Sequence, residues 1–311
     1  MPGRTQIHVA TVTALTVAVL AVSSSAPIIA YAAAPALAIA FWRNAFSTVL
    51  LAPVAATRRR VEFRELLSGA GRATLLSCTL AGVALAVHFG TWVPSAKLTS
   101  VADAVALGAT QPVWQGLIAS GQGRRPTRVA WIGISVAVTG AIATTGADIG
   151  VSARAVSGDL LALAGGMAIA VYTAYGERAR TATSTVTYTT ICYGVCAVLL
   201  GAVCLIFRVR LAGYPGLTWL AIAGLVFGAQ LLGHSMFNYA LHRVSATTVS
   251  VLILLEVPGA ALIAWLWLGQ APSAASWPGL ALLPIGVAIV VLGSRRAAVT
   301  EPVADPIALA D

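Results

Sequence analysis

Two charged side chains stand near the middle of long apolar segments, where a charge is costly and needs a reason. Arg43 lies within ALAIAFWRNAFSTVLLAP, and Glu256 lies within VLILLEVPGAALIAW. An ionised side chain at the centre of a bilayer costs about 2.5–3.5 kcal/mol on insertion scales. Arg43 is suited to binding an anionic group, and Glu256 to carrying a proton or pairing with an amine. The structural alternative is an ion pair between them, or hydrogen bonds to carbonyls that Pro258 frees.

A second group combines polar and aromatic side chains at one depth. His88 precedes Trp92 by four residues, which puts both on one face of a helix. Gln111 and Trp114 occur in the next apolar segment. We predict that these four side chains line one amphipathic cavity. The alternative for His88 is a hydrogen-bonded core histidine, and for His234 we expect only such a structural role.

Tyr172 and Asn238 carry polar tips that need partners once buried. They form either walls of the cavity or plain hydrogen bonds between helices. We expect no catalytic residue, no cofactor and no metal site, because neither HExxH nor GxSxG occurs. The candidate binding residues are Arg43, His88, Trp92, Gln111, Trp114, Tyr172, Asn238 and Glu256.

The composition indicates what must position these residues. Of the 311 residues, 59% are hydrophobic and 9% charged, and the mean hydropathy is +0.88, whereas a soluble domain has roughly 25% charged residues. The chain is therefore predicted to be an all-α integral membrane protein. Its net charge of +9 does not indicate nucleic-acid binding, because the basic residues separate apolar segments and form no basic soluble face. The single lysine, Lys97, follows Ala96, which excludes a P-loop ATPase.

Ten windows of about 20 mainly apolar residues predict ten transmembrane helices. With the N-terminus inside, 14 of the 19 basic residues fall on the cytoplasmic side and 4 outside, which predicts that both termini are cytoplasmic. A cleaved signal peptide is the rival interpretation of the first window. The windows are His8–Ile28, Ala34–Val54, Ala73–Pro94, Leu98–Ser120, Val129–Gly146, Asp159–Tyr175, Thr185–Phe207, Leu217–Ala240, Ser245–Leu268 and Trp277–Gly293.

An internal repeat relates the two halves of the chain. The pattern W-x-G-x6-G that begins at Trp131 recurs at Trp277, a shift of 146 residues, and Pro112 meets Pro258 at the same shift. Five helices per half is an odd number, so the second half enters the membrane from the opposite side and the repeats are inverted. We expect five-helix repeats at 1–147 and 157–296 and a disordered cytoplasmic tail at 297–311.

Four longer segments span most of the predicted helices: WRNAFSTVLLAP, HFGTWVPSAKLTSVADAVALGATQPVW, GDLLALAGGMAIAVYTAY and FNYALHRVSATTVSVLILLEVPGAALIAWLWLG. Together they resemble the drug/metabolite transporter superfamily in its EamA-type ten-helix branch. The resemblance covers nearly the whole chain up to Arg296. Members usually end the fourth and ninth helices with Gly-Glu and read Glu-Pro in the ninth. Here Gly121-Gln122, Gly269-Gln270 and Glu256-Val257-Pro258 stand instead, so roles of those acidic residues do not carry over.

Together these features predict a secondary transporter in the plasma membrane that is not driven by ATP. We expect an exporter of small polar or amphipathic metabolites such as amino acids, with proton coupling as one option. Its partners would be the small-molecule substrate and the lipid bilayer, with no nucleic acid. The alternative is a membrane-embedded enzyme acting on a lipid-linked or amphipathic substrate. The cargo, the coupling ion, the direction of flux and the choice between monomer and homodimer stay open.

Overall fold

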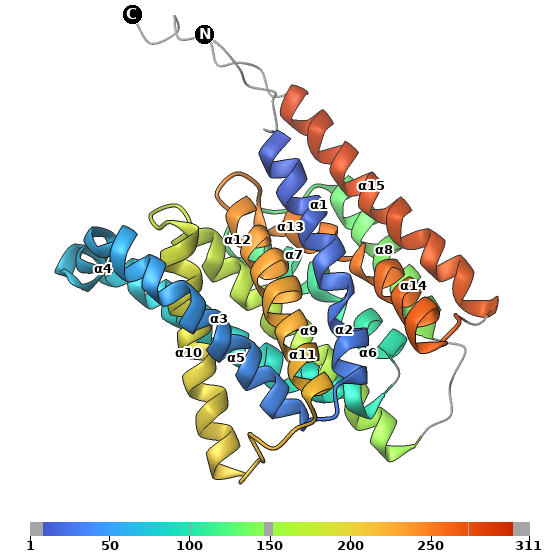
Figure 1. The fold of residues 1–311 in the computed structure, drawn as a ribbon. Helices are drawn as coiled ribbons and strands as arrows, with labels where there is room; N and C mark the ends of the chain where they lie inside the picture. Colours follow the sequence, from blue (N-terminus) through green and yellow to red (C-terminus); the bar gives the residue numbers. More distant parts are fainter. Residues whose placement is uncertain (1–8, 100, 146–151, 273, 301–311) are drawn as a thin grey trace, which may run out of the picture.

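The fold is a bundle of helices, seen in a computed structural model that describes residues 9–99, 101–145, 152–272 and 274–300 (Figure 1). These described residues contain no β-strand. Most of the predicted tail, 301–311, lies outside them. The helices are α1 (Val9–Ser23), α2 (Ser25–Tyr31), α3 (Ala36–Arg58), α4 (Arg60–Leu67), η1 (Gly69–Gly71), α5 (Arg72–Leu98), α6 (Val101–Gly108), α7 (Gln111–Gly121), α8 (Arg128–Thr145), α9 (Ala153–Ala179), α10 (Thr185–Ile206), α11 (Gly216–Gly224), η2 (Leu225–His234), α12 (Ser235–Ala240), α13 (Ala246–Ile253), α14 (Glu256–Leu268), η3 (Ala274–Ser276) and α15 (Trp277–Thr300).

In the described part of the chain, seven helical segments are long and apolar enough to cross a membrane, which agrees with an all-α integral membrane protein. Arg128–Ala143 and Trp277–Leu292 are shorter apolar helices at two further predicted windows. The remaining window, Leu98–Ser120, contains α6 and α7. The seven segments are Val9–Tyr31, Ala36–Arg58, Arg72–Leu98, Ala153–Ala179, Thr185–Ile206, Gly216–Ala240 and Ala246–Leu268.

Local sequence sets several helix ends. Ser152, Ser184 and Ser245 precede α9, α10 and α13, and each hydroxyl accepts a hydrogen bond from the backbone N–H three residues later. These caps satisfy donors that have no partner inside the helix. Gly269, with a φ of 71°, ends α14 in the left-handed conformation that glycine adopts without a steric penalty.

Two predicted spans are broken near their centres, each just before a proline. Pro112 and Pro258 cannot donate the hydrogen bond that would continue the helix. Hydrogen bonds between residues three apart, instead of four, occur at the breaks: Thr110 N donates to Leu107 O at 3.2 Å, and Leu255 N donates to Leu252 O at 3.1 Å. As a result α6 and α7 form one discontinuous helix, and α13 and α14 form another. A shift of 145 residues carries the bounds of α6 onto those of α13 and the first residue of α7 onto that of α14.

The helix contacts follow the repeat. Helix α3 packs against α10, and α8 packs against α15, so each of these helices touches its own equivalent in the other half (Figure 1). Helix α5 packs against α9. Their equivalents in the other half also pack together, because α1 contacts η2 and α12. If each helix is replaced by its equivalent in the other half, the same set of contacts therefore results.

Small residues allow the closest of these contacts. A Cβ placed on Gly286 of α15 would lie 2.5 Å from Ala137 N and 2.6 Å from Gly133 O on α8. No side chain fits at that distance, so the two helices can touch backbone to backbone only with glycine there. The repeated W-x-G-x6-G pattern thus serves as the packing surface between the two halves.

We expect Gly286→Ala to lower the free energy of unfolding by about 1–3 kcal/mol, because the added methyl group forces α8 and α15 apart. Gly216→Ala is the matched control, since a Cβ at Gly216 meets nothing within 4 Å. The measurement is the melting temperature of each purified protein in detergent. Equal melting temperatures for the two variants would contradict the packing argument.

Candidate functional site

A cavity of about 60 Å³ lies where the two broken helices meet. Its polar lining comes from α2, α5, α7, η2 and α14, and the rest comprises aromatic rings of α5 and α12 together with aliphatic residues and Gly108. Both halves of the chain therefore contribute to one cavity. The lining residues are Val22, Ser25, His88, Phe89, Trp92, Val105, Gly108, Ala109, Gln111, Ile169, His234, Phe237, Ile253, Glu256 and Val257.

The lining repeats the relation between the halves. His88 and His234 are 146 residues apart, and their ring centroids are 6.3 Å apart. Gln111 and Glu256, 145 residues apart, are the first residues of α7 and α14 and also line the cavity. The cavity is therefore lined by pairs of equivalent residues, one from each half.

His88 is held in one orientation by backbone that approaches closely. Its Nδ1 lies 2.9 Å from Gly165 O on α9. Because a carbonyl only accepts, Nδ1 carries the proton, and the neutral ring keeps Nε2 as an acceptor. A Cβ on Gly165 would lie 2.9 Å from Cβ of Trp92, so a larger residue would push α9 away. The His88 ring also stacks on Trp92, with centroids 5.8 Å apart.

Glu256 meets the cavity from the first turn of α14. A negative charge is favourable at this end of a helix, where backbone N–H groups lack partners. Its carboxylate accepts no hydrogen bond from the described residues, and it forms no ion pair with Arg43. Of the two structural alternatives for Arg43 and Glu256, direct pairing is therefore absent from the described part of the chain.

Arg43 lies one layer behind the cavity and is fully buried. Its Nε donates to Gln230 Oε1 at 2.8 Å, and its Nη1 donates to Ser25 Oγ at 3.3 Å. Its guanidinium stacks 4.1 Å from the ring centre of Phe89. Ser25 and Phe89 line the cavity, so they separate the charge from it. Nη2 of Arg43 makes no hydrogen bond with the described residues.

Gln230 is the centre of this buried network. It accepts from Arg43, and its Nε2 donates to Asn44 Oδ1 at 3.0 Å. Gln230 lies in η2, a π-helix of ten residues. Such helices are rare and occur often at functional sites. The same segment carries His234 at its end, so this one irregular element serves both the arginine network and the cavity.

The structure separates the predicted binding residues into three groups. His88, Trp92, Gln111 and Glu256 line the cavity. Arg43 lies behind it. Tyr172, Asn238 and Trp114 are not among the lining residues. Asn238 Nδ2 donates to Tyr172 Oη at 2.5 Å, which joins α12 to α9 beside the cavity.

Trp114 departs from the expectation that it would share the cavity with His88, Trp92 and Gln111. Its Nε1 donates to Thr110 Oγ1 at 3.2 Å, so its polar tip is satisfied one turn back, at the helix break. The side chain is only half-buried. Thr110 lies four residues before Trp114, so the two side chains share one helix face.

His234 is the lining residue that the sequence argument undervalued. Its ring lies 5.3 Å from Phe89 and 6.5 Å from Tyr172, centre to centre. The signal was present in the repeat, because the shift of 146 residues that aligns Trp131 with Trp277 also aligns His88 with His234. Applying the shift to polar residues, and not only to glycine, proline and tryptophan, would have identified it.

Comparisons with known proteins agree with this architecture. The sequence profile of the EamA-like transporter family matches residues 9–146 and 156–292. A crystal structure of a protein superposes with a TM-score of 0.72 and 21% sequence identity, covering 92% of this chain and 98% of the other. At that identity the likeness concerns the fold alone. Among curated proteins, the comparison finds no match.

We expect Gln230→Leu to lower the free energy of unfolding by about 3–5 kcal/mol, because it leaves the buried Arg43 without its principal acceptor. Gln115→Leu is the matched control: Gln115, in α7, is almost equally buried, and its Oε1 has no partner among the described residues. Melting of both proteins in detergent, followed by tryptophan fluorescence, provides the measurement. If Gln115→Leu were destabilised as much as Gln230→Leu, the hydrogen bonds to Arg43 would add no stability beyond that of any buried glutamine.

Proposed function

The chain belongs to the EamA-like transporter family, and we propose that within it the protein is a secondary exporter of small polar or amphipathic metabolites such as amino acids. Membership in this family means a multi-pass membrane protein with a small-molecule substrate. It also favours a transporter over the membrane-embedded enzyme that the sequence left as an alternative. ATP is not the energy source in this proposal, because the chain carries no P-loop lysine.

The observation that carries the proposal is the cavity at the junction of the two halves. Pairs of residues related by the repeat, such as His88 with His234 and Gln111 with Glu256, line it. We propose ten transmembrane helices arranged as two inverted five-helix repeats, as the exchanged helix contacts support. In such an architecture the halves exchange conformations, and a site between them opens to either side in turn.

The cavity lining supports a small amphipathic cargo. Trp92, Phe89 and Phe237 offer apolar surface, while Gln111 and the two histidines offer hydrogen bonds. The volume of about 60 Å³ is room for a few waters. Glu256 is the one carboxylate in the lining, and we propose that it carries a coupling proton or pairs with a cargo amine.

The proposed location is the plasma membrane, with both termini in the cytoplasm. The distribution of arginine supports this orientation. The described ends of the chain, at the start of α1 and the end of α15, also lie at the same end of the bundle (Figure 1).

The experiment for this function is counterflow into proteoliposomes, tested with each labelled neutral amino acid. We expect His88→Ala and His234→Ala to reduce exchange of the accepted cargo at least about tenfold each, because both rings face the cavity from equivalent positions. His242→Ala is the control, since His242 contacts Arg180 O at 3.2 Å, outside the cavity. Absence of exchange for the whole panel would refute the proposed cargo class.

A separate prediction concerns Glu256. Glu256→Gln should fold normally, because no described residue bonds its carboxylate, yet it should abolish proton-driven uptake into inverted vesicles. Glu65→Gln, at the exposed end of α4, should leave uptake unchanged. Full proton-driven uptake by a stable Glu256→Gln protein would remove this residue from the transport cycle.

A further inference from the structure

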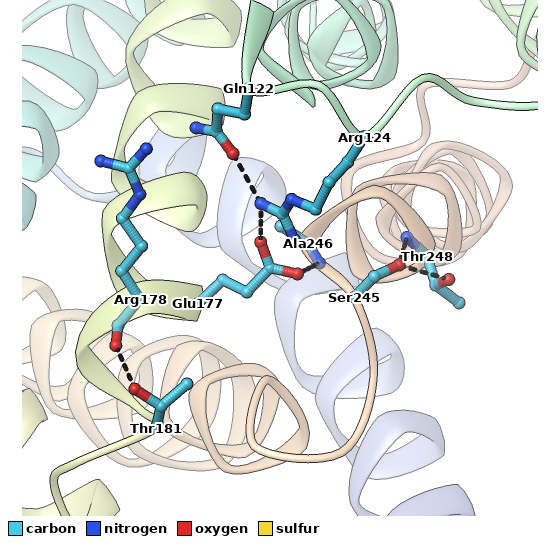
Figure 2. A network of polar contacts seen from close by, with 8 residues as sticks. All are labelled: Gln122, Arg124, Glu177, Arg178, Thr181, Ser245, Ala246 and Thr248. Carbon is cyan, nitrogen blue, oxygen red and sulfur yellow. Dashed lines mark hydrogen bonds and ion pairs between the residues drawn. The ribbon is translucent and has the colours of Figure 1, made fainter. Parts of the chain in front are cut away.

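A polar network away from the central cavity joins three elements at one end of the bundle (Figure 2). Arg124 Nη2, from the loop after α7, lies 2.7 Å from Glu177 Oε2 near the end of α9. The other carboxylate oxygen of Glu177 accepts from Ala246 N, the first residue of α13, at 3.1 Å. Arg124 also donates to Gln122 Oε1 at 2.5 Å. Figure 2 shows no contact between the side chain of Arg178, the next residue along, and Arg124 or Glu177; its carbonyl oxygen accepts from Thr181 Oγ1 at 2.7 Å.

The network crosses the boundary between the halves. Arg124 belongs to the first matched segment, whereas Glu177 and Ala246 belong to the second. The Glu177 side chain is mostly buried, and the one carboxylate both pairs with an arginine and occupies the positive end of a helix. The hydrogen bond to Glu177 raises the pKa of Arg124, and the negative charge of that carboxylate adds to the effect. These contacts hold α9, α13 and the α7–α8 loop together.

A pocket of about 290 Å³ lies beside this network and is larger than the central cavity. Gln115 is buried in its wall with 1% of its surface exposed, and its Oε1 has no hydrogen-bond partner among the described residues. A buried acceptor without a partner is costly, which points to a ligand or water that supplies the donor. The lining residues are Gln115, Ala119, Arg124, Arg125, Pro126, Thr127, Ala130, Glu177, Ser245, Thr247, Thr248 and Val290.

The pocket and the central cavity follow each other along the same two helices. On α7, Gln111 lines the cavity and Gln115, one turn later, lines the pocket. On α13, Ile253 lines the cavity and Thr248 lines the pocket. Helices α7 and α13 pack against each other, one from each half. A separation of these two helices would connect the two spaces.

The equivalent position in the other half has different chemistry. The shift of 146 residues carries Glu177 onto Tyr31. Tyr31 contacts Trp267 near the end of α14, with ring centroids 5.0 Å apart. One end of the bundle is therefore joined by an ion pair and the opposite end by an aromatic contact.

We propose that the pocket beside Gln115 is the cytoplasmic entrance to the central cavity and that the contact of Arg124, Glu177 and Ala246 closes it. Gln115 then offers its carbonyl oxygen to a donor group of the entering cargo, such as an ammonium or a hydroxyl. This assignment rests on the proposed transport function. It makes Arg124 and Glu177 positioning residues, which control access without contacting the cargo in the central cavity.

The test measures access to the entrance and needs no cargo. In the Gln115→Cys protein, the new thiol is labelled with a membrane-impermeant methanethiosulfonate reagent in inside-out vesicles. The four native cysteines are buried, and the parent protein gives the background. Adding Glu177→Gln or Arg124→Gln should raise the labelling rate about fivefold, the effect of losing a partly exposed ion pair. Arg178→Gln, on the same helix end, should leave the rate unchanged.

Further measurements separate closure from general loosening. The double variant Arg124→Gln with Glu177→Gln should label no faster than either single variant, because the two residues act as one contact. Labelling from right-side-out vesicles should be slower than from inside-out vesicles. Unchanged labelling in folded Glu177→Gln protein, or an equal rise with Arg178→Gln, would overturn the proposal. The labelling rate does not depend on cargo. If the labelling results are as expected but no amino acid is exchanged in counterflow, the proposed cargo class is refuted and the proposed closure stands.

Discussion

Backbone hydrogen bonding inside hydrocarbon is the constraint on which this structure depends. A membrane helix can be interrupted only where protein, and not lipid, surrounds the break. Here both interruptions, before Pro112 and Pro258, lie at the contact between the halves and border the central cavity. Shorter turns satisfy part of the lost bonding, as where Val257 N donates to Leu254 O at 3.2 Å. The same breaks turn the first residues of α7 and α14, Gln111 and Glu256, toward the cavity.

A second consequence of the apolar surroundings is the position of Arg43. A buried guanidinium must have acceptors, and the chain supplies them from three other elements through Gln230, Ser25 and the face of Phe89. None of these is a carboxylate, so the positive charge stays uncompensated by direct contact. It lies one layer behind the lining, where it contributes to the electric potential in the cavity without contacting a bound molecule. Glu256 does line the cavity, and it is the one carboxylate among the lining residues.

Sequence reasoning predicted the membrane class, the apolar helices and the repeat, because these depend on composition and spacing. It also identified four of the lining residues, since an ionisable or amphipathic side chain in an apolar helix needs a polar environment. Rotation about a helix axis is harder to predict, and Trp114 shows why: its partner, the hydroxyl of Thr110, lies at a break whose geometry depends on packing. The π-helix that carries Gln230 and His234 has no local signature at all. It packs against α1 and α3.

The two halves keep a common backbone plan, and they differ in chemistry at some equivalent positions. Gln111 stands where the second half has Glu256, and Tyr31 stands where it has Glu177. If the halves were chemically identical, the two conformations that they exchange would have equal free energy, apart from any difference between the two solutions. An ion pair at one end and an aromatic contact at the other remove that equality, because salt and the electric potential across the membrane act on charges and not on stacked rings. Under the proposed transport function, these unequal contacts at the two ends would bias which side the empty site faces at rest.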